Sequence, residues 1–185
     1  GSNSGILDEV RLSSPQAVLN RELVRLAAGS QGASRSSLSD FGGEHASWEG
    51  WAPLGGASLK RGAGRLEAKL PSVGAAVAVG SLGLPIGKKR YLTGDATGAA
   101  RDLQCTLLTE RGAGNVMVPL WESGRTTTGD LAGLPCWGGE LRALAFSLPV
   151  GAGGELTLRQ AWISERVEGR PYVYVRSLAP GRALL

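Results

Sequence analysis

A two-residue alternation of apolar and polar side chains constrains the fold of this chain more than any other feature of its sequence. The segment 64–70, GRLEAKL, places an apolar residue at every second position, and ELTLRQAWI at 155–163 follows the same period. Period two sends successive side chains to opposite faces of a strand, so each segment should bury one face. The residues expected to share one face of the second segment are Leu156, Leu158, Gln160 and Trp162.

Turn-forming residues divide the rest of the chain into pieces of strand length. The sequence holds 29 glycines among 185 residues, scattered between short apolar runs without a Gly-X-Y period. From Asp40 onward this spacing is typical of a sandwich or barrel, and no segment there has a helical period. We therefore predict an all-β fold, an antiparallel β-sandwich of the jelly-roll kind. The strands are expected near 48–51, 57–60, 64–70, 75–82, 89–96, 102–109, 115–121, 141–148, 155–164 and 171–178.

One helix is predicted near the N-terminus, over 15–28. Ser14 can cap its free N–H groups, and Pro15 suits the first helical position. Its apolar face must pack on either the sandwich or a partner chain. The polar Gly/Ser segment that follows predicts a division into two parts, 1–39 with a strand, the helix and a linker, and 40–185 with the sandwich.

Charge and cysteine content exclude several classes of protein. The net charge is +4, and the one basic cluster, 88–90, is interpreted as solvated strand-end charge rather than as a nucleic-acid surface. No apolar run reaches the length of a membrane span. Cys105 and Cys136 could form one disulfide or remain two buried thiols, and the sequence leaves both alternatives open.

A catalytic set is missing from the sequence. His45 is the only histidine, and no Gly-x-Ser-x-Gly elbow accompanies it. The acidic residues lie in loops, at outward strand positions or beside turn glycines, so no pair suggests acid–base catalysis. We expect a protein that is not an enzyme.

Tryptophan is the commonest aromatic residue of this chain, with five tryptophans beside three tyrosines and two phenylalanines. Indole rings stack on the apolar faces of sugars, and neighbouring polar groups bind the hydroxyls. Trp162, within a strand, is expected to stabilise the core, and Trp48 and Trp51 are expected to hold the first strand on the sandwich. The residues predicted to bind a ligand are Trp121, Trp137, Trp48, Glu122, Arg125 and Glu140.

Several segments together resemble a known family. Asp40-Phe41, then Trp48-Glu-Gly-Trp51, LPIGKKRYLTGDATG at 84–98 and LTLRQAWISE at 156–165 resemble carbohydrate-binding-module jelly rolls of the galactose-binding-like type, over about 40–165. The resemblance implies a structural calcium, although Gln160 stands near the place of an acidic ligand. Asp40 and Glu165 could supply oxygen ligands instead; no other cofactor is expected.

The leading functional hypothesis is a non-catalytic carbohydrate-binding or glycan-facing accessory module of a larger extracellular, cell-surface or virion protein. Its expected partner is a polysaccharide or glycan, not nucleic acid. A second hypothesis is an assembly domain that docks on other subunits of a particle such as a phage tail or surface appendage. A third is a glycoside hydrolase, which would need two carboxylates facing each other across a cleft.

Overall fold

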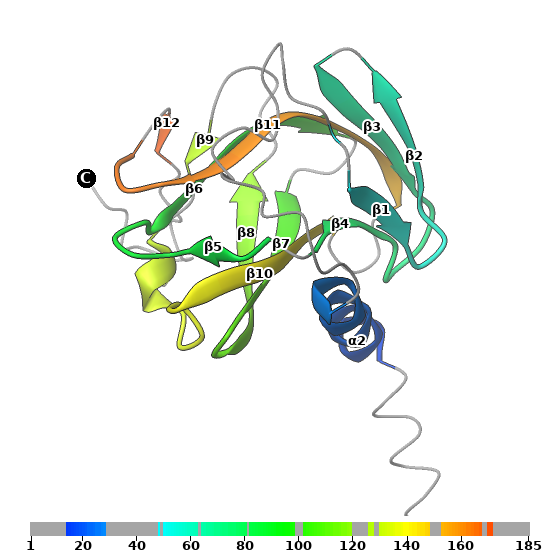
Figure 1. The fold of residues 1–185 in the computed structure, drawn as a ribbon. Helices are drawn as coiled ribbons and strands as arrows, with labels where there is room; N and C mark the ends of the chain where they lie inside the picture. The colour runs from blue at the N-terminus through cyan, green and yellow to red at the C-terminus, as the bar shows by residue number, and fades with distance from the viewer. Residues whose placement is uncertain are drawn as a thin grey trace, which may run out of the picture.

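Two β-sheets packed face to face, with one helix on the outside, form this protein in a computed structural model (Figure 1). The structure describes residues 14–28, 48, 50–62, 64–80, 82–98, 102–119, 126–127, 130–148, 153–167 and 170–171. Apart from one hairpin in each sheet, neighbouring strands are not consecutive in sequence, so the chain crosses between the sheets repeatedly. Within these residues the predicted antiparallel sandwich with one N-terminal helix is confirmed. The division at residues 39 and 40 stays a prediction, because both residues lie outside the described ranges.

The first sheet has the strand order β1-β4-β10-β7-β8, and β5 pairs with β10 beside β4. All of its pairs are antiparallel. Pro53 lies in β1 at the sheet edge, where the missing N–H of a proline costs no ladder hydrogen bond. The strands are β1 (Trp51–Leu54), β4 (Ala76–Val79), β5 (Leu84–Pro85), β7 (Asp102–Thr109), β8 (Gly112–Pro119) and β10 (Glu140–Ser147).

The second sheet has the order β12-β9-β6-β11-β3-β2 and is antiparallel except for the short pair β12 and β9. Its short strands β9 and β12, like β5 of the first sheet, were not predicted at their bounds, because two residues carry too little periodicity. The strands are β2 (Ser58–Gly62), β3 (Arg65–Leu70), β6 (Tyr91–Gly98), β9 (Thr126–Thr127), β11 (Gly154–Ser164) and β12 (Arg170–Pro171).

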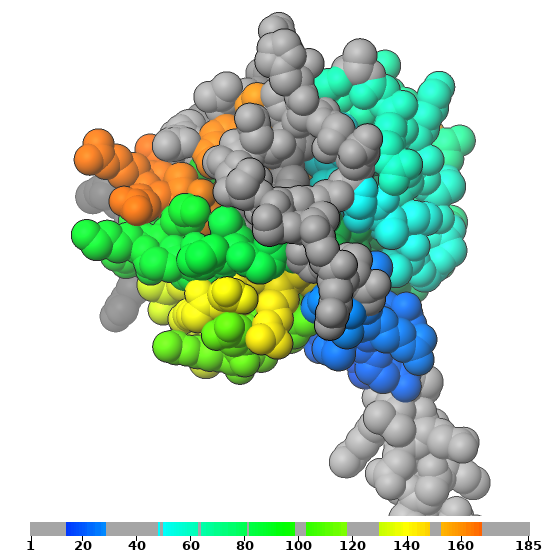
Figure 2. Space-filling model, in the orientation of Figure 1, coloured from blue at the N-terminus to red at the C-terminus, as the bar shows by residue number. Residues whose placement is uncertain are grey.

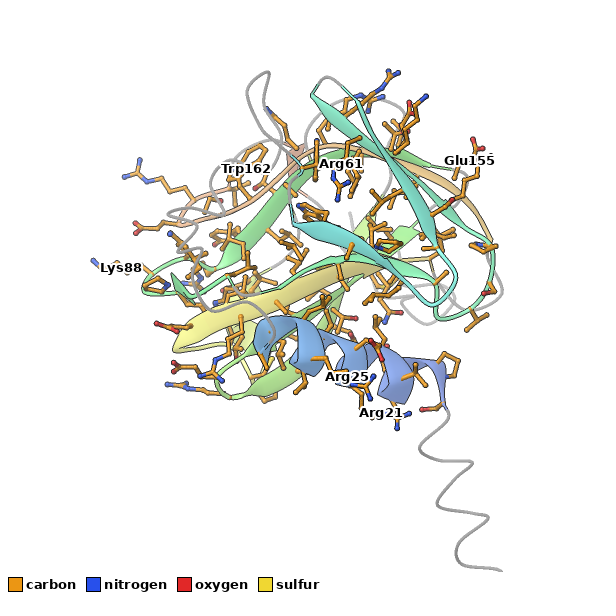
Figure 3. The ribbon with its side chains drawn as sticks, turned by 45° about the vertical axis from the view of Figure 1, so that its right-hand side comes forward. Arg21, Arg25, Arg61, Lys88, Glu155 and Trp162 are labelled. Atoms are coloured by element: carbon orange, nitrogen blue, oxygen red, sulfur yellow. The ribbon has the colours of Figure 1, made fainter. Side chains whose placement is uncertain are left out.

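Aromatic residues from the start of the sandwich fill the centre of the core. Trp48 is 2% exposed and meets Trp51 edge-on, with ring centroids 5.4 Å apart. Trp51 in turn stacks on Phe146 at 5.8 Å. Arg61 of β2 donates hydrogen bonds to the carbonyls of both tryptophans, at 2.9 and 2.5 Å, and so ties this segment to the second sheet (Figure 3). These contacts confirm that Trp48 holds the first strand on the sandwich.

A β-bulge in β11 overturns the predicted facing of Trp162. The register with β6 shifts between Leu158 and Gln160, so the alternation changes face at that point. Ala161 and Ile163 then take the buried positions, at 1% and 3% exposure. Trp162 is half-buried on the opposite, outer face of the sheet. The expectation that Gln160 and Trp162 share the inward face is therefore wrong.

Helix α2 (Pro15–Ala28) covers the outer face of the first sheet, as the space-filling view also shows (Figure 2). The Ser14 hydroxyl accepts a hydrogen bond from the backbone N–H of Ala17 at 3.3 Å, which confirms the predicted cap. Leu19 and Leu23 are buried against small side chains of the two central strands, and Arg21 and Arg25 point away from the sandwich (Figure 3). The alanines beneath the helix are Ala76, Ala78, Ala143 and Ala145.

The helix approaches the sheet so closely that the point of contact has room only for a residue without a side chain. A Cβ atom at Gly80 would lie 2.6 Å from the carbonyl carbon of Leu26. At the other end of the helix, Gln104 of β7 donates a hydrogen bond to the Gln16 side chain at 2.7 Å. Of the two docking alternatives for this helix, the structure therefore selects the sandwich of the same chain.

Both cysteines are free thiols inside the sandwich. Cys105 faces the core from β7, and its burial raises the pKa of its thiol. Burial also raises the pKa of the Cys136 thiol. The Cys136 sulfur lies so close to Gly114 that a Cβ atom at Gly114 would be 2.6 Å from it. The sequence left a disulfide and two buried thiols as alternatives, and the structure shows two buried thiols.

Candidate functional site

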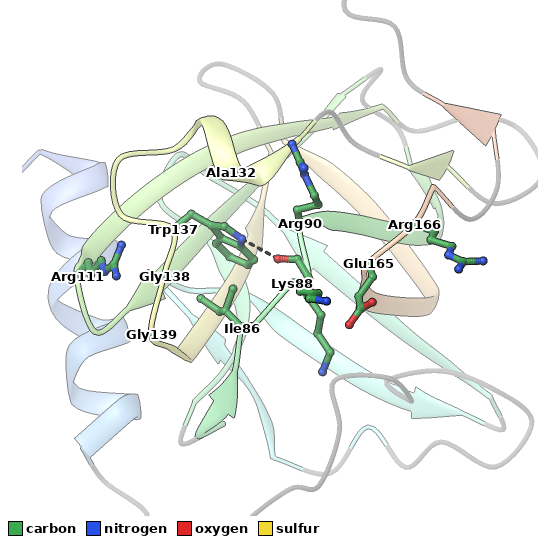
Figure 4. Close-up of a pocket in the computed structure, with 12 residues that line it drawn as sticks. Ile86, Lys88, Arg90, Arg111, Ala132, Trp137, Gly138, Gly139, Glu165 and Arg166 are labelled. Carbon is green, nitrogen blue, oxygen red and sulfur yellow. Dashed lines mark hydrogen bonds between the residues drawn. The ribbon is translucent and has the colours of Figure 1, made fainter.

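A wide pocket opens at one end of the sandwich, where loops from both sheets converge (Figure 4). Its volume is about 810 Å³. The turn between β5 and β6, the β7–β8 hairpin, the segment after the short helix η2 (Leu131–Gly133) and the end of β11 all contribute to it. We call it the end pocket; its lining residues are Ile86, Gly87, Lys88, Lys89, Arg90, Arg111, Ala132, Trp137, Gly138, Gly139, Glu165 and Arg166.

A tight turn after β5 positions the lysines of the end pocket. The backbone N–H of Lys89 donates to the Ile86 carbonyl at 2.8 Å and closes the turn. Gly87 has a φ of 52°, a left-handed conformation that glycine adopts without steric cost. Ile86 is further bonded to the carbonyl of Gly139, next to β10, and the following Arg90 to the carbonyl of Ser164 in β11. The turn is thus bonded to both sheets.

Trp137 connects the wall of the end pocket to this turn. Its Nε1–H donates to the Lys89 carbonyl at 2.9 Å (Figure 4). The indole is 9% exposed, so it forms a largely sealed wall rather than an open stacking platform. Ile86 lies beside it and is 3% exposed. The apolar part of the pocket is therefore rigid and small.

Unpaired positive charge surrounds the end pocket. Arg90 is the paired member of the basic set: its Nε donates to Asp130 at 2.8 Å, and its Nη2 contacts the other carboxylate oxygen. Among the described residues, the other cations form no ion pair. Glu165 is the one carboxylate in the described lining. These other cations are Lys88, Lys89, Arg111 and Arg166.

A glycine leaves room for one of these cations. A Cβ atom at Gly138 would lie 2.5 Å from the guanidinium carbon of Arg111, so the arginine lies directly against the backbone there. Thr109 accepts a hydrogen bond from the backbone N–H of Arg111 at 3.0 Å and fixes the hairpin turn. Figure 4 places Arg111 on one side of Trp137, and Lys88 with Glu165 on the other.

The outer face of the second sheet carries a different kind of surface. A groove of about 290 Å³ crosses β2, β3 and the start of β11. Its lining holds two lysines and two glutamates, and three of these four charges are paired: Lys69 lies 3.9 Å from Glu155, and Glu67 lies 3.1 Å from Arg65. Lys60 forms no ion pair among the described residues. Farther along β11, Arg159 lies 3.3 Å from Asp95 of β6. Such a face is balanced in charge, and exposed pairs of this type contribute little free energy.

The predicted site residues separate into three groups. The structure brings Trp137 and Glu165 together in the end pocket. Trp48 is sealed in the core and offers no face to a ligand, and Glu140 begins β10 outside the pocket lining. The predicted residues that lie outside the described ranges are Trp121, Glu122, Arg125 and Asp40.

Of the two residues predicted to bind calcium, the structure describes one. Glu165 lines the end pocket, and Asp40 lies outside the described residues. The described part of the chain contains no group of three His, Cys, Asp or Glu side chains that could hold a metal ion. A calcium site therefore stays a prediction.

The sequence interpretation missed the cations of the pocket. The cluster at 88–90 was visible, but it was interpreted as solvated strand-end charge. Arg111 and Arg166 carried no local signal, because they join the cluster only when the hairpin and the end of β11 fold beside it.

No helix in the described residues is long and apolar enough to cross a membrane.

The fold is that of β-sandwich carbohydrate-binding modules. No family model and no curated protein matches this chain in sequence. A family 29 carbohydrate-binding module variant is similar to it with a TM-score of 0.51 and 12% identity, over 76% of this chain and 97% of the module. Another variant of such a module, in complex with cellulohexaose, gives 0.50 and 11% identity, over 68% and 86%. The predicted resemblance is confirmed at the level of the fold.

A larger enzyme contains a similar part. An exo-β-agarase structure matches with a TM-score of 0.50 and 9% identity, over 71% of this chain. The match covers 25% of the agarase chain, so the chain spans about a quarter of that enzyme's length. The likeness concerns the sandwich fold alone.

Proposed function

We propose that this protein is a non-catalytic carbohydrate-binding module and that the end pocket holds the glycan. The observation that carries the proposal is the open pocket itself, on a sandwich whose structural neighbours include a module complexed with cellulohexaose. Its volume of about 810 Å³ falls in the range of about 300–1,000 Å³ typical of small-molecule sites. The module would serve a larger extracellular, cell-surface or virion protein as an accessory part.

The lining of the pocket suits a sugar chemically. The apolar contact that the lining offers to the C–H face of a ring is small, since Trp137 is 9% exposed and Ile86 is 3% exposed. Lys88 and Arg111 carry hydrogen-bond donors for ring hydroxyls, and Glu165 carries acceptors. Because the turn and the hairpin are held by backbone hydrogen bonds, little ordering is needed when a ligand enters.

A titration with oligosaccharides, followed by tryptophan fluorescence and calorimetry, tests the proposal. Cellulose, agar and acidic polysaccharide fragments should include at least one ligand. The affinity for a neutral fragment should fall when Glu165→Ala removes the hydrogen-bond acceptor, by about two- to five-fold for a lost exposed interaction. The matched control is Glu67→Ala in the groove of the second sheet, which should leave binding unchanged. A protein that binds none of these glycans would refute the proposal.

Two alternative functions have less support. The assembly hypothesis rests on a helix in need of a docking surface and on extended arms at the two ends of the chain. Helix α2 docks on its own sheet, and the two ends lie outside the described residues. A hydrolase of the usual type needs two opposed carboxylates, and the described lining of the end pocket provides Glu165 alone. No described contact favours either function over glycan binding.

A further inference from the structure

We infer that the ligand of the end pocket is an anionic saccharide, a glycan whose rings carry carboxylate or sulfate groups. The inference rests on the proposed function, and it names the class of glycan. Its basis is the charge distribution around the pocket, which differs from that of the other groove on the same molecule.

The end pocket concentrates positive charge, most of which forms no ion pair among the described residues. Four described cations without an ion pair line it against one carboxylate, whereas the fifth lining cation, Arg90, is held by Asp130. The groove of the second sheet has two lysines, Lys60 and Lys69, and two glutamates, Glu67 and Glu155. A concave surface lined by one sign of charge raises the local concentration of oppositely charged ligands. The balanced groove lacks that property.

The geometry of the cations favours planar or tetrahedral oxyanions carried on a chain. Arg111 lies against Gly138, where the missing side chain leaves room for its guanidinium at the pocket wall. A guanidinium can donate two parallel hydrogen bonds to one carboxylate or sulfate. Lys88 stands across Trp137 from it, at the tip of the closed turn (Figure 4). The two cations can therefore meet anionic groups on successive parts of one saccharide.

Glu165 distinguishes a sugar from a simple polyanion. Its carboxylate would repel a ligand that is anionic along its whole surface, but it can accept a hydrogen bond from a hydroxyl group. A saccharide that alternates hydroxyls and anionic groups satisfies both the cations and this acceptor. A DNA backbone has a phosphate at every residue and no hydroxyl within the chain, so it satisfies the cations alone.

The test compares oligosaccharides with the same backbone and different charge. Cellohexaose, its C6-oxidised uronate counterpart and its sulfated counterpart are titrated by calorimetry at about 0.01 M and about 0.3 M salt, where the screening length falls from about 30 Å to under 8 Å. At low salt we expect at least one charged hexamer to bind about ten-fold or more tightly than cellohexaose, and the preference to shrink at high salt. A thymidylate hexamer carries negative charge on a DNA backbone instead of a glycan, and it should bind more weakly than the charged oligosaccharide.

Charge-matched variants locate the effect. Lys88→Gln with Arg111→Gln should reduce the affinity for the charged hexamer by about four- to twenty-five-fold, the product of about two- to five-fold for each exposed charge pair. Lys60→Gln with Lys69→Gln removes the same net charge from the other groove and should leave the affinity unchanged. All four residues are exposed, and thermal melting should show both variants folded.

Each other result would overturn a stated part of the reasoning. Equal binding of neutral and charged hexamers would refute the anionic preference and leave carbohydrate binding intact. Binding of none of the saccharides tested above would refute the proposed function as well. An unchanged preference in the Lys88 and Arg111 variant would refute the assignment to the end pocket, and equal binding of the thymidylate hexamer would refute a saccharide ligand.

Discussion

Replacing Leu23 by alanine should separate the contribution of helix α2 from that of the sandwich. Leu23 is 0% exposed and packs on the alanines of β4 and β10. The change removes three carbon atoms, worth about 2.4 kcal/mol at about 0.8 kcal/mol for each buried methylene. Buried leucine-to-alanine changes cost about 2–5 kcal/mol, and a helix at the surface can settle toward the sheet and shrink the cavity. We therefore expect a loss of about 2–3 kcal/mol in the free energy of unfolding.

The adjacent residue supplies a matched control. Val24 is 54% exposed on the same helix, and alanine favours helices more than valine does. Val24→Ala should therefore change the free energy of unfolding by less than about 0.5 kcal/mol. Urea denaturation followed by circular dichroism measures both variants, and amide exchange reports on the helix. If Leu23→Ala were as mild as Val24→Ala, the helix would not be docked as the structure shows.

Three further changes probe other parts of the fold. Gly80→Ala should cost about 1–3 kcal/mol in urea denaturation because its Cβ meets helix backbone, whereas Gly133→Ala, with open space around it, should be mild; equal effects would contradict the close approach. Trp137→Phe removes the hydrogen bond to the Lys89 carbonyl and should cost about 2 kcal/mol and weaken glycan binding, so unchanged stability would argue against this tie. Burial raises the pKa of the Cys105 thiol above the value of about 8.5 in the unfolded chain, so the free energy of unfolding should fall as the pH rises past that value, by up to about 1.4 kcal/mol per pH unit. Cys105→Ala should make the free energy of unfolding less dependent on pH in this range, and an unaltered dependence would contradict the burial of this thiol.

Local sequence patterns were sufficient to predict most elements of this fold. The helix begins at Pro15 and ends at Ala28 as its cap and its leucine spacing predict, since capping and amphipathic periodicity act within a few residues. The alternation at 64–70 predicts β3 and its inward set correctly. The strand pattern also supported the resemblance to carbohydrate-binding modules, which the fold comparison bears out.

Trp162 shows where local periodicity fails. The alternation of 155–163 is regular in sequence, but one extra residue at the bulge turns every later side chain to the opposite face. The bulge arises from pairing with β6, a strand some sixty residues earlier, so nothing within the segment itself reveals it. The facing of Trp48 was open for a similar reason, because its burial depends on Trp51 and on Arg61 from the neighbouring strand.

What the sequence by itself determined was the class of this protein: short alternating strands, glycine turns and one capped helix, each governed by interactions between near neighbours. Only the tertiary structure placed the residues of the end pocket together. Lys88, Arg111 and Glu165 are far apart along the chain and carry no common motif. They become one pocket because the turn after β5 is hydrogen-bonded to both sheets and Trp137 fastens it from the side. Charge that looked dispersed in sequence is concentrated by long-range backbone pairing, and that pairing is a property of the folded chain.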